Sequence, residues 1–593
     1  METHVSTTRC GGEIDMKNAM MILTLCITLV GTTSALAFSD VTPQAFQGNS
    51  YSVVAWGDVD GNGTPDLFLG CADNGHSRLF LNMGSSWTNV TDTYGVSNIN
   101  HVTSARFADY DQDGMLDLLC LTDDGSGIEL YRQTANHRYQ PVELNFEEES
   151  SAGIHAAMWC DANDDGVFDL MLSNRSRSNS ESVLLVPTSD EFIEERGADG
   201  PFAESGVKAL SCIDFDQDGD LDYFISKDEG TTTLWTNQDG RFADLGSHLG
   251  FEVKMGQDGV TWGDFNRDGK LDFYACGSPN NSCLYYQRGA TGELPFSFQD
   301  MTDYFDFRPL TPSATSASAV DINGDGWTDL FLASRLGNIV LMNDHGRAWI
   351  QSERITHLQQ TNRGTRSVAW ADFDGDGDLD VAMAQGRNGV RLFRNDRAMN
   401  HEFISLDLCG SGESMTPALN CLVQVVFPYG KQWAATSMYT ASNGGDDMTQ
   451  ILYNPSYYHS EEWTVHILWS NGLVTTLDEM DIPLNGVMTV HMPETPSADN
   501  NMVVTPMELP EVANYPNPFN PTTNISFNLS ESAYISLSIY NLLGQEVANL
   551  ASGQYEAGQH SLVFDASALP SGLYMARLEA PSGSVVHRML LTK

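Results

Sequence analysis

Residues 38–396 carry short apolar runs that return at a regular interval. One set comprises PDLFLGC, LDLLCL, LDYFIS, LDFYAC, TDLFLA and LDVAMA, each bounded by turn-forming residues. Runs of this length and composition are typical of buried strands. A second apolar run follows each one, as in SRLFLNM, and a more polar third segment follows most, as in SWTNVTD. The pattern therefore predicts consecutive short strands.

An acidic decapeptide precedes each of these apolar pairs and occurs seven times. The first copy, DVDGNGTPDL, begins at Asp58, and the others begin at Asp109, Asp161, Asp214, Asp264, Asp321 and Asp372. The successive intervals are 51, 52, 53, 50, 57 and 51 residues. A regular period near fifty indicates a repeat protein. Each unit holds a strand entering the loop, a strand leaving it and two more, which is the content of one β-propeller blade.

The seven decapeptides, numbered here as loops one to seven, have the composition of calcium sites. Positions 1, 3 and 5 carry Asp or Asn, position 6 is always Gly, position 7 varies, and position 9 is always Asp. Ca²⁺ takes six to eight oxygen ligands, and glycine permits the tight turn. A variable position 7 fits a ligand that is a backbone carbonyl. We expect up to seven Ca²⁺ ions with a mainly structural role. The predicted ligands are, loop by loop, Asp58, Asp60, Asn62, Thr64 and Asp66; Asp109, Asp111, Asp113, Met115 and Asp117; Asp161, Asn163, Asp165, Val167 and Asp169; Asp214, Asp216, Asp218, Asp220 and Asp222; Asp264, Asn266, Asp268, Lys270 and Asp272; Asp321, Asn323, Asp325, Trp327 and Asp329; Asp372, Asp374, Asp376, Asp378 and Asp380.

The EF-hand shares this acidic opening but needs Glu at position 12 and a helix on each side. Position 12 is apolar in every copy, and the flanking runs predict strands: Leu69, Cys120, Leu172, Ile225, Ala275, Leu332 and Met383. The loops instead resemble the FG-GAP/VCBS calcium repeats of integrin α-chain propellers. This resemblance covers roughly residues 38–396 and implies a seven-bladed β-propeller.

The two ends of the repeat region predict how such a ring closes. FSDVTPQA, which begins at Phe38, is similar to the last strand of another unit, FQDMTDYF, and the seventh unit has only three predicted strands. We expect residues 38–42 to supply the missing outer strand, because that pairing hides two open sheet edges.

Five units carry an aromatic residue two positions before the first aspartate of the loop. A sugar-binding ladder and packing between neighbouring blades are the two explanations, and packing is favoured. The five residues are Trp56, Phe107, Trp159, Trp262 and Trp370.

Three segments with other patterns follow the propeller, which we assign to residues 38–398. Residues 399–493 include WTVHILWSNGLVTTL, which alternates around an Asn-Gly turn. This segment resembles the ASPIC/UnbV domain of cartilage acidic proteins, although Ser470 and Asn471 replace the usual Pro-Ser. Residues 494–513 are rich in Pro, Glu, Asn and Ser and predict a linker.

Residues 514–593 contain NYPNPFNPTTNISFNL and SGLYMARL, with strand and turn spacing that suits an Ig-like β-sandwich. They resemble the type A C-terminal sorting domain of the type IX secretion system. That resemblance implies a Gram-negative source, a partner in the type IX machinery, and a secreted or outer-surface location. The expected fold class is therefore all-β: a seven-bladed β-propeller, a small β domain and a C-terminal Ig-like β-sandwich.

The N-terminus predicts a secretory signal within residues 1–37. The signal starts at Met16, continues through an apolar run, and ends in Ala35-Leu36-Ala37, an A-x-A cleavage pattern. The apolar run is too short to span a bilayer, and no later stretch reaches about 18 apolar residues. We expect no transmembrane segment in the mature chain.

Charge and cysteine content narrow the remaining choices. The chain has 30 Lys+Arg against 79 Asp+Glu, a formal net charge of -49. We therefore expect no nucleic-acid partner, because phosphate binding needs clustered basic residues. Eight of the ten cysteines follow the signal, and two pairs could form disulfides, Cys276 with Cys283 and Cys409 with Cys421. Burial as thiols is favoured for the other four.

The expected function is that of a binding or adhesion module for an extracellular polysaccharide or protein, because propellers present variable loops on a rigid scaffold. The alternative is a polysaccharide lyase or hydrolase. No nucleophile elbow, HExxH or other catalytic motif occurs, so we expect no enzyme.

Overall fold

Almost all regular structure in the described residues is β-strand. The computed structural model describes residues 38–591 except 124–126, 145–153, 163–166, 175–181, 189–191, 196–199, 219, 228–231, 239–240, 246–258, 278–281, 292–293, 308–313, 335, 353–355, 360–363, 397–402, 412–420, 427–431, 437–449, 454–462, 470–472, 479–481, 483–486, 494–511, 516–518, 530–532, 542–545, 556–557, 568, 570–571 and 581–582. The helical segments within these residues are short: η1 (Gln44–Phe46), α2 (Thr91–Tyr94), η2 (Pro201–Ala203) and α4 (Thr356–Gln359).

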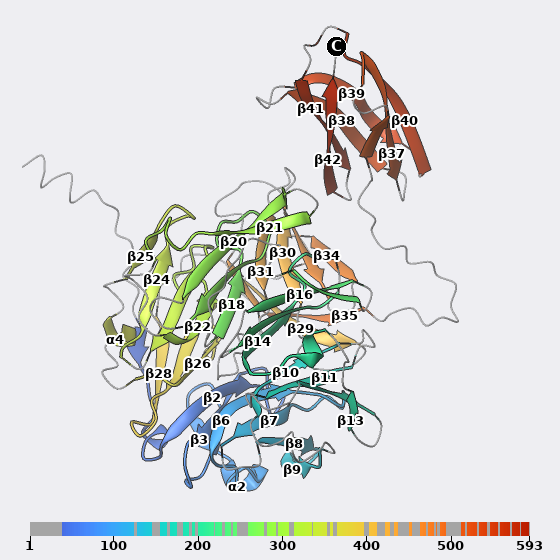
Figure 1. Cartoon of the computed structure of the whole chain (residues 1–593). Coiled ribbons are helices and arrows are strands. Elements are labelled where there is room, and N and C mark those ends of the chain that lie inside the picture. The colour runs from blue at the N-terminus through green and yellow to red at the C-terminus, as the bar shows by residue number, and fades with distance from the viewer. Residues whose placement is uncertain are drawn as a thin grey trace, which may run out of the picture.

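The described part of residues 38–395 forms seven four-stranded antiparallel sheets, which confirms an all-β, propeller-like fold (Figure 1). The sheets, numbered one to seven in chain order, are β2 (Tyr51–Gly57), β3 (Asp66–Cys71), β4 (Arg78–Asn82) and β5 (Trp87–Asn89); β6 (Val102–Ala108), β7 (Asp117–Thr122), β8 (Ile128–Thr134) and β9 (Arg138–Val142); β10 (Ile154–Cys160), β11 (Asp169–Asn174), β12 (Val183–Pro187) and β13 (Phe192–Glu195); β14 (Val207–Ile213), β15 (Asp222–Lys227), β16 (Thr233–Gln238) and β17 (Arg241–Asp244); β18 (Gly259–Gly263), β19 (Asp272–Cys276), β20 (Cys283–Thr291) and β21 (Leu294–Asp300); β22 (Ala314–Val320), β23 (Asp329–Ser334), β24 (Ile339–Asn343) and β25 (Trp349–Gln351); β26 (Ser367–Ala371), β27 (Asp380–Ala384), β28 (Val390–Asn395) and β1 (Phe38–Asp40).

The seventh sheet takes its outer strand from the other end of the repeat region. β1 pairs antiparallel with β28, with Phe38 opposite Asn395 and Asp40 opposite Phe393. The pairing continues one residue further, where the amide of Val41 donates to the carbonyl of Leu392 at 3.0 Å. The predicted closing strand is therefore confirmed. It ties the two ends of the ring together without leaving the edge of β28 open.

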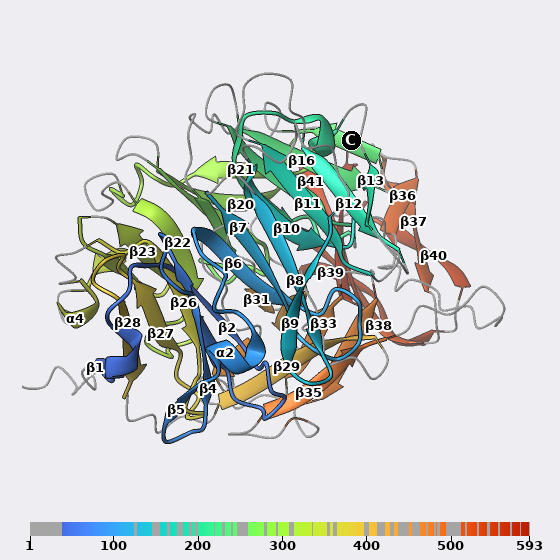
Figure 2. The same cartoon turned by 90° about the horizontal axis from the view of Figure 1, so that it is seen from below.

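Neighbouring sheets join through their first strands. β2 packs against both β6 and β26, and Figure 2 shows these strands side by side. The indole of Trp56 in β2 donates to the carbonyl of Ala369 in β26 at 3.1 Å, and the Val54 amide donates to Ser367 Oγ at 3.3 Å. The first and seventh sheets are thus linked by hydrogen bonds between residues that lie more than three hundred positions apart in the sequence.

The aromatic residues that precede the loops pack between sheets. Trp56 stacks on Phe373 of the adjacent loop with ring centroids 6.1 Å apart and an interplanar angle of 7°. Trp159 stacks in the same way on Tyr110. Trp56 and Trp159 are at most 2% exposed, so their faces are closed to a sugar. The packing explanation is confirmed for these positions.

The small β domain consists of two sheets with one shared core. The first is β32 (Gln450–Tyr453), β29 (Phe403–Ser411) and β35 (Val487–Met492), and the second is β31 (Gln432–Thr436), β30 (Leu422–Val426), β33 (Thr464–Leu468) and β34 (Val474–Asp478). The domain contacts the loop end of the propeller. Gln424 donates to Gln217 in loop four at 3.2 Å, and Phe403 lies directly against Gly377 of loop seven.

The C-terminal residues form a two-sheet sandwich around a common apolar core, drawn in red in Figure 1. Its sheets are β36 (Val512–Tyr515), β37 (Thr522–Leu529) and β40 (Gly558–Asp565), and β39 (Glu546–Tyr555), β38 (Ala533–Asn541), β41 (Gly572–Ala580) and β42 (Gly583–Leu591). The Ig-like character expected for this segment stays a prediction.

The cysteines and the segments outside the propeller and the two β domains bear on the remaining predictions. All eight cysteines after residue 37 are buried thiols, so neither suggested disulfide is formed. The predicted signal within residues 1–37, and the linker except for its last two residues, lie outside the described residues. Within the described part of the chain, no helix combines the length and the apolar character needed to cross a membrane.

Candidate metal centres

Each acidic loop joins the first and second strands of its sheet. In the first sheet, Asp58 directly follows β2 and Asp66 opens β3. The same order recurs in the other six sheets, where the position-9 aspartate is always the first residue of the second strand. Strands therefore flank every loop, which confirms the exclusion of an EF-hand.

The aspartate at position 1 shapes the turn. Asp58 accepts hydrogen bonds from the amides of Asn62 at 3.0 Å and Gly63 at 2.7 Å. The same two contacts recur at Asp109, Asp264, Asp321 and Asp372. The position-6 glycines described in these loops have φ between 78° and 90°, a left-handed conformation that a side chain would strain.

The aspartate at position 9 has a second role that the sequence analysis missed. Asp66 accepts from the amide of Val59 at 3.0 Å and from the amide of Asn82, in the third strand, at 2.7 Å. Equivalent pairs of bonds are made by Asp117, Asp222, Asp272, Asp329 and Asp380. Each of these carboxylates is fully or almost fully buried. It therefore clamps the loop to the sheet in addition to facing a candidate cation.

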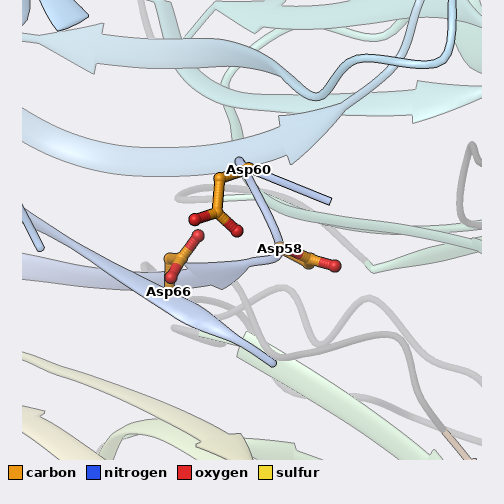
Figure 3. A group of neighbouring side chains, drawn as sticks. All are labelled: Asp58, Asp60 and Asp66. Atoms are coloured by element: carbon orange, nitrogen blue, oxygen red, sulfur yellow. The ribbon is translucent and has the colours of Figure 1, made fainter. Parts of the chain in front are cut away.

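Among the described residues, four loops each bring oxygens of three carboxylates within 4.8 Å of one another. The sets are Asp58, Asp60 and Asp66; Asp109, Asp111 and Asp117; Asp214, Asp216 and Asp218; and Asp372, Asp374 and Asp380. In Figure 3 the carboxylates of Asp60 and Asp66 point toward each other. Loops five and six have Asn at position 3, and loop three has its positions 3 and 5, Asn163 and Asp165, outside the described residues.

Burial makes these clustered carboxylates hard to ionise. Burial, with smaller contributions from the neighbouring charges of Asp60 and Asp58, raises the pKa of Asp66 to about 8. The pKa of Asp117 rises to about 9, again mainly through burial and then through Asp111 and Asp109. Amide donors oppose part of each shift. A divalent cation at the centre of the cluster removes this penalty, because it replaces repulsion between like charges with attraction.

Orphaned atoms show where such a cation fits. One carboxylate oxygen of Asp111 and one of Asp216 are buried without a hydrogen-bond partner, as is the side-chain oxygen of Asn266. All three residues occupy position 3 of their loops. A buried acceptor without a partner costs about 1–3 kcal/mol, and a hard cation that prefers oxygen ligands would satisfy it. The residues present fit Ca²⁺, which would cross-link the loop to both strands. The position-7 carbonyls remain predicted ligands.

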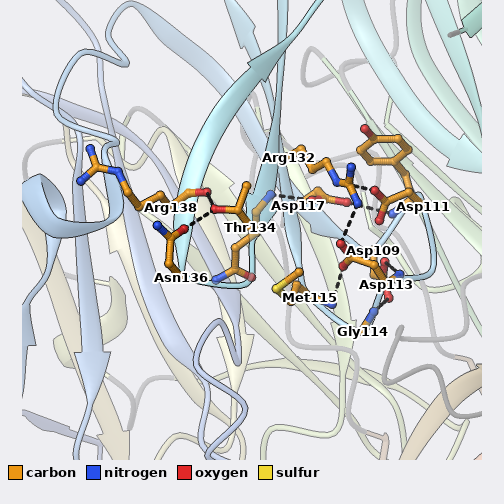
Figure 4. Close-up of polar contacts among 12 residues, drawn as sticks. Asp109, Asp111, Asp113, Gly114, Met115, Asp117, Arg132, Thr134, Asn136 and Arg138 are labelled. Atoms are coloured by element: carbon orange, nitrogen blue, oxygen red, sulfur yellow. Dashed lines mark hydrogen bonds and ion pairs between the residues drawn. The ribbon is translucent and has the colours of Figure 1, made fainter. Parts of the chain in front are cut away.

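Arginine side chains enter two of the loops, a feature that the sequence analysis did not anticipate. Arg132 in β8 places Nε 2.5 Å from Asp111 and Nη2 2.9 Å from Asp113 (Figure 4). Arg394 in β28 lies 3.7 Å from Asp374 and pairs with Asp396 at 2.6 Å. Each arginine comes from the third strand of the same sheet. These guanidinium groups partly neutralise loops two and seven.

Comparison with known families agrees with the repeats and with the C-terminal sandwich. Residues 58–120, 109–172, 214–275, 264–332 and 321–383 match the model of the FG-GAP-like repeat. Residues 513–592 match the secretion system C-terminal sorting domain. The chain thus contains FG-GAP-like repeats within a propeller-like fold and a C-terminal sorting domain of the type IX secretion system.

Individual relatives match part of the chain. Cartilage acidic protein 1 from mouse is 24% identical over 382 residues, covering 60% of this chain and 52% of the mouse protein. The human protein of that name is 29% identical over 199 residues, which cover 31% of this chain and 29% of the human one. The chain therefore spans at most about half the length of these relatives. A match to cartilage acidic proteins agrees with the ASPIC/UnbV resemblance of residues 399–493.

Solved structures of similar shape include an Agrocybe aegerita lectin described as recognising non-reducing terminal N-acetylglucosamine. It has a TM-score of 0.37 and 16% identity, over 59% of this chain and 86% of the lectin. PorZ, described as a surface component of the type IX secretion system of Porphyromonas gingivalis, has a TM-score of 0.25 and 12% identity, over 92% of this chain and 82% of PorZ.

Proposed function

We propose that this protein is a calcium-stabilised module that binds an extracellular polysaccharide or protein. The repeats and the sorting domain point to a secreted, surface-associated, propeller-like protein. In this proposal the type IX machinery delivers the chain to the outer surface of a Gram-negative cell through residues 514–593, and the propeller then engages its ligand.

The observation that carries the proposal is the engagement of the acidic loops in the scaffold itself. The carboxylate oxygens of the position-1 and position-9 aspartates accept hydrogen bonds from backbone amides of the loop and of the third strand. Carboxylates held in this way stabilise the sheets, and a bound cation would add to that stability by mass action. They are poorly placed to serve as the mobile acid and base of a glycosidase. A polysaccharide lyase or hydrolase remains the alternative.

The test uses the mature chain, residues 38–593, in calcium and in EDTA. It is screened against immobilised polysaccharides and extracellular proteins, and the same polysaccharides are assayed for new reducing ends or unsaturated products. The proposal expects saturable binding in calcium, loss of binding in EDTA, and no product. Steady turnover of any polysaccharide would favour the enzyme instead.

Export is tested separately in a type IX-competent cell. The full-length chain is expected at the surface or in the medium, and a chain that lacks residues 514–593 is expected to stay in the periplasm. Equal surface delivery of both chains would contradict a sorting role for the C-terminal sandwich.

A further inference from the structure

A shallow depression of about 540 Å³ lies between the fifth and sixth sheets. Its lining consists of Asn266 and Asp268 of loop five, Tyr286 and Arg288 of β20, Gln299 of β21, and residues of the segment that follows β21. The volume falls within the range of about 300–1,000 Å³ that is usual for small-ligand sites. Asn266 and Asp268 are predicted calcium ligands of loop five, so the depression adjoins that candidate cation site. The other lining residues have no role in the functions assigned above.

Aromatic rings form its outer rim. The side chain of Tyr304 is 76% exposed, and its ring meets Phe305 edge to face with centroids 4.8 Å apart. Phe305 in turn packs on Tyr286, with centroids 5.8 Å apart. Phe305 therefore contacts both Tyr304 and the buried Tyr286, while the Tyr304 ring stays open to solvent. An aromatic ring held rigidly at a rim offers apolar contact area at low entropic cost.

Arg288 and Gln299 hold each other in place by a hydrogen bond and keep further N–H donors. Arg288 donates from Nε to Gln299 Oε1 at 3.0 Å and lies 5.4 Å from the centroid of the Tyr286 ring. Among the described residues no carboxylate forms an ion pair with Arg288, so its terminal nitrogens keep donor capacity. The Gln299 amide adds N–H donors.

N–H donors and an exposed aromatic ring around one open hollow match a ligand that has hydroxyl groups and an apolar C–H face. Among the residues that line the depression, Arg288 is the one cation and Asp268 is the one carboxylate, in a chain of net charge -49, which disfavours a polyanion. We propose that this depression binds one sugar unit of a neutral glycan. The sugar ring lies against Tyr304, and its hydroxyls bond to Arg288 and Gln299. This inference rests on the proposed binding function and gives it a site and a ligand class.

The experiment uses the mature chain in calcium and an array of glucose-, galactose- and mannose-terminated neutral oligosaccharides, with uronate-containing oligosaccharides alongside. The dissociation constant for the best neutral ligand is then measured for three variants. Tyr304→Ala and Arg288→Ala are expected to weaken binding about tenfold or more, and Tyr304→Phe is expected to bind like the parent. The control is Leu336→Ala, which removes a side chain that is 85% exposed, does not line the depression and follows the C-terminal end of β23.

The outcomes separate this inference from the broader function. Unchanged glycan binding by Tyr304→Ala and Arg288→Ala would overturn the site and leave the binding module intact. Preference for uronate-containing ligands, or binding only to an extracellular protein, would overturn the neutral-glycan assignment alone. A parent chain that binds neither these oligosaccharides nor any extracellular protein in the screen described above would overturn both. Because Tyr304 is exposed, its variants should melt with the parent, and this is checked before binding is compared.

Discussion

Two aspartates of loop seven should respond differently to calcium, although both belong to one carboxylate cluster. Asp374 at position 3 makes a 3.7 Å ion pair with Arg394, and its side chain is 23% exposed. Asp380 at position 9 is fully buried and accepts from the amides of Phe373 at 3.1 Å and Asn395 at 2.7 Å. The perturbations compared are Asp374→Ala and Asp380→Ala.

The structure sets the expected magnitudes. Without metal, Asp374→Ala removes an ion pair worth at most about 1 kcal/mol and relieves repulsion within the cluster, so the net change is small. Asp380→Ala leaves two buried amides without acceptors, which costs about 2–6 kcal/mol at about 1–3 kcal/mol each. In about 10 mM calcium, a site with a dissociation constant of about 10⁻⁴–10⁻³ M adds about 1.4–2.7 kcal/mol of stability. Asp374→Ala loses that contribution.

The assay is thermal unfolding of the parent and both variants, each in EDTA and in about 10 mM calcium, with the propeller transition followed separately from those of the other domains. Asp374→Ala should match the parent in EDTA and melt several degrees lower in calcium. Asp380→Ala should melt lower in both buffers. Equal destabilisation by Asp374→Ala in the two buffers would refute metal ligation at position 3. A defect of Asp380→Ala confined to calcium would refute the clamp.

Three further predictions follow from other contacts. In EDTA the raised pKa values of Asp66, about 8, and Asp117, about 9, mean that the folded chain keeps protons that the unfolded chain releases near pH 4. Their stabilising contribution is therefore complete below about pH 4 and is lost as the pH rises through about 8–9, so the melting temperature should fall between about pH 5.5 and pH 8.5. Calcium should make the melting temperature less dependent on pH. A melting temperature in EDTA that does not change with pH would contradict the shifts. Deletion of residues 38–42 should expose the edge of β28 and lower the melting temperature of the propeller, whereas an unchanged melting curve would contradict the closing strand. Arg132→Ala should raise the calcium affinity of loop two, measured by calorimetry against Arg138→Ala as control, because Arg132 shares Asp111 and Asp113 with the cation; unaltered affinity would show that the ion pair does not compete.

Much of the architecture could be predicted because it is written in local patterns. The period near fifty residues follows from seven decapeptides whose spacing is visible in the sequence. Alternation and length identify the strands, and the apolar residues at position 12 exclude the EF-hand. The closing strand could be predicted too, because one unit lacked a strand and Phe38 began a segment similar to one. These features depend on residues that are neighbours along the chain.

The tertiary structure decided the contacts between residues that are distant in sequence. Position 9 became a clamp because folding brings Asn82 beside Asp66, and Arg132 entered loop two from the third strand. The stack of Trp56 on Phe373 and the hollow beneath Tyr304 exist only where separate sheets or connecting segments meet. Hydrogen bonds, ion pairs and stacking act over a few ångströms in space, so chain spacing alone does not specify which partners meet. The sequence by itself therefore determined the repeating strands and acidic loops, and packing between sheets determined which side chains support each loop.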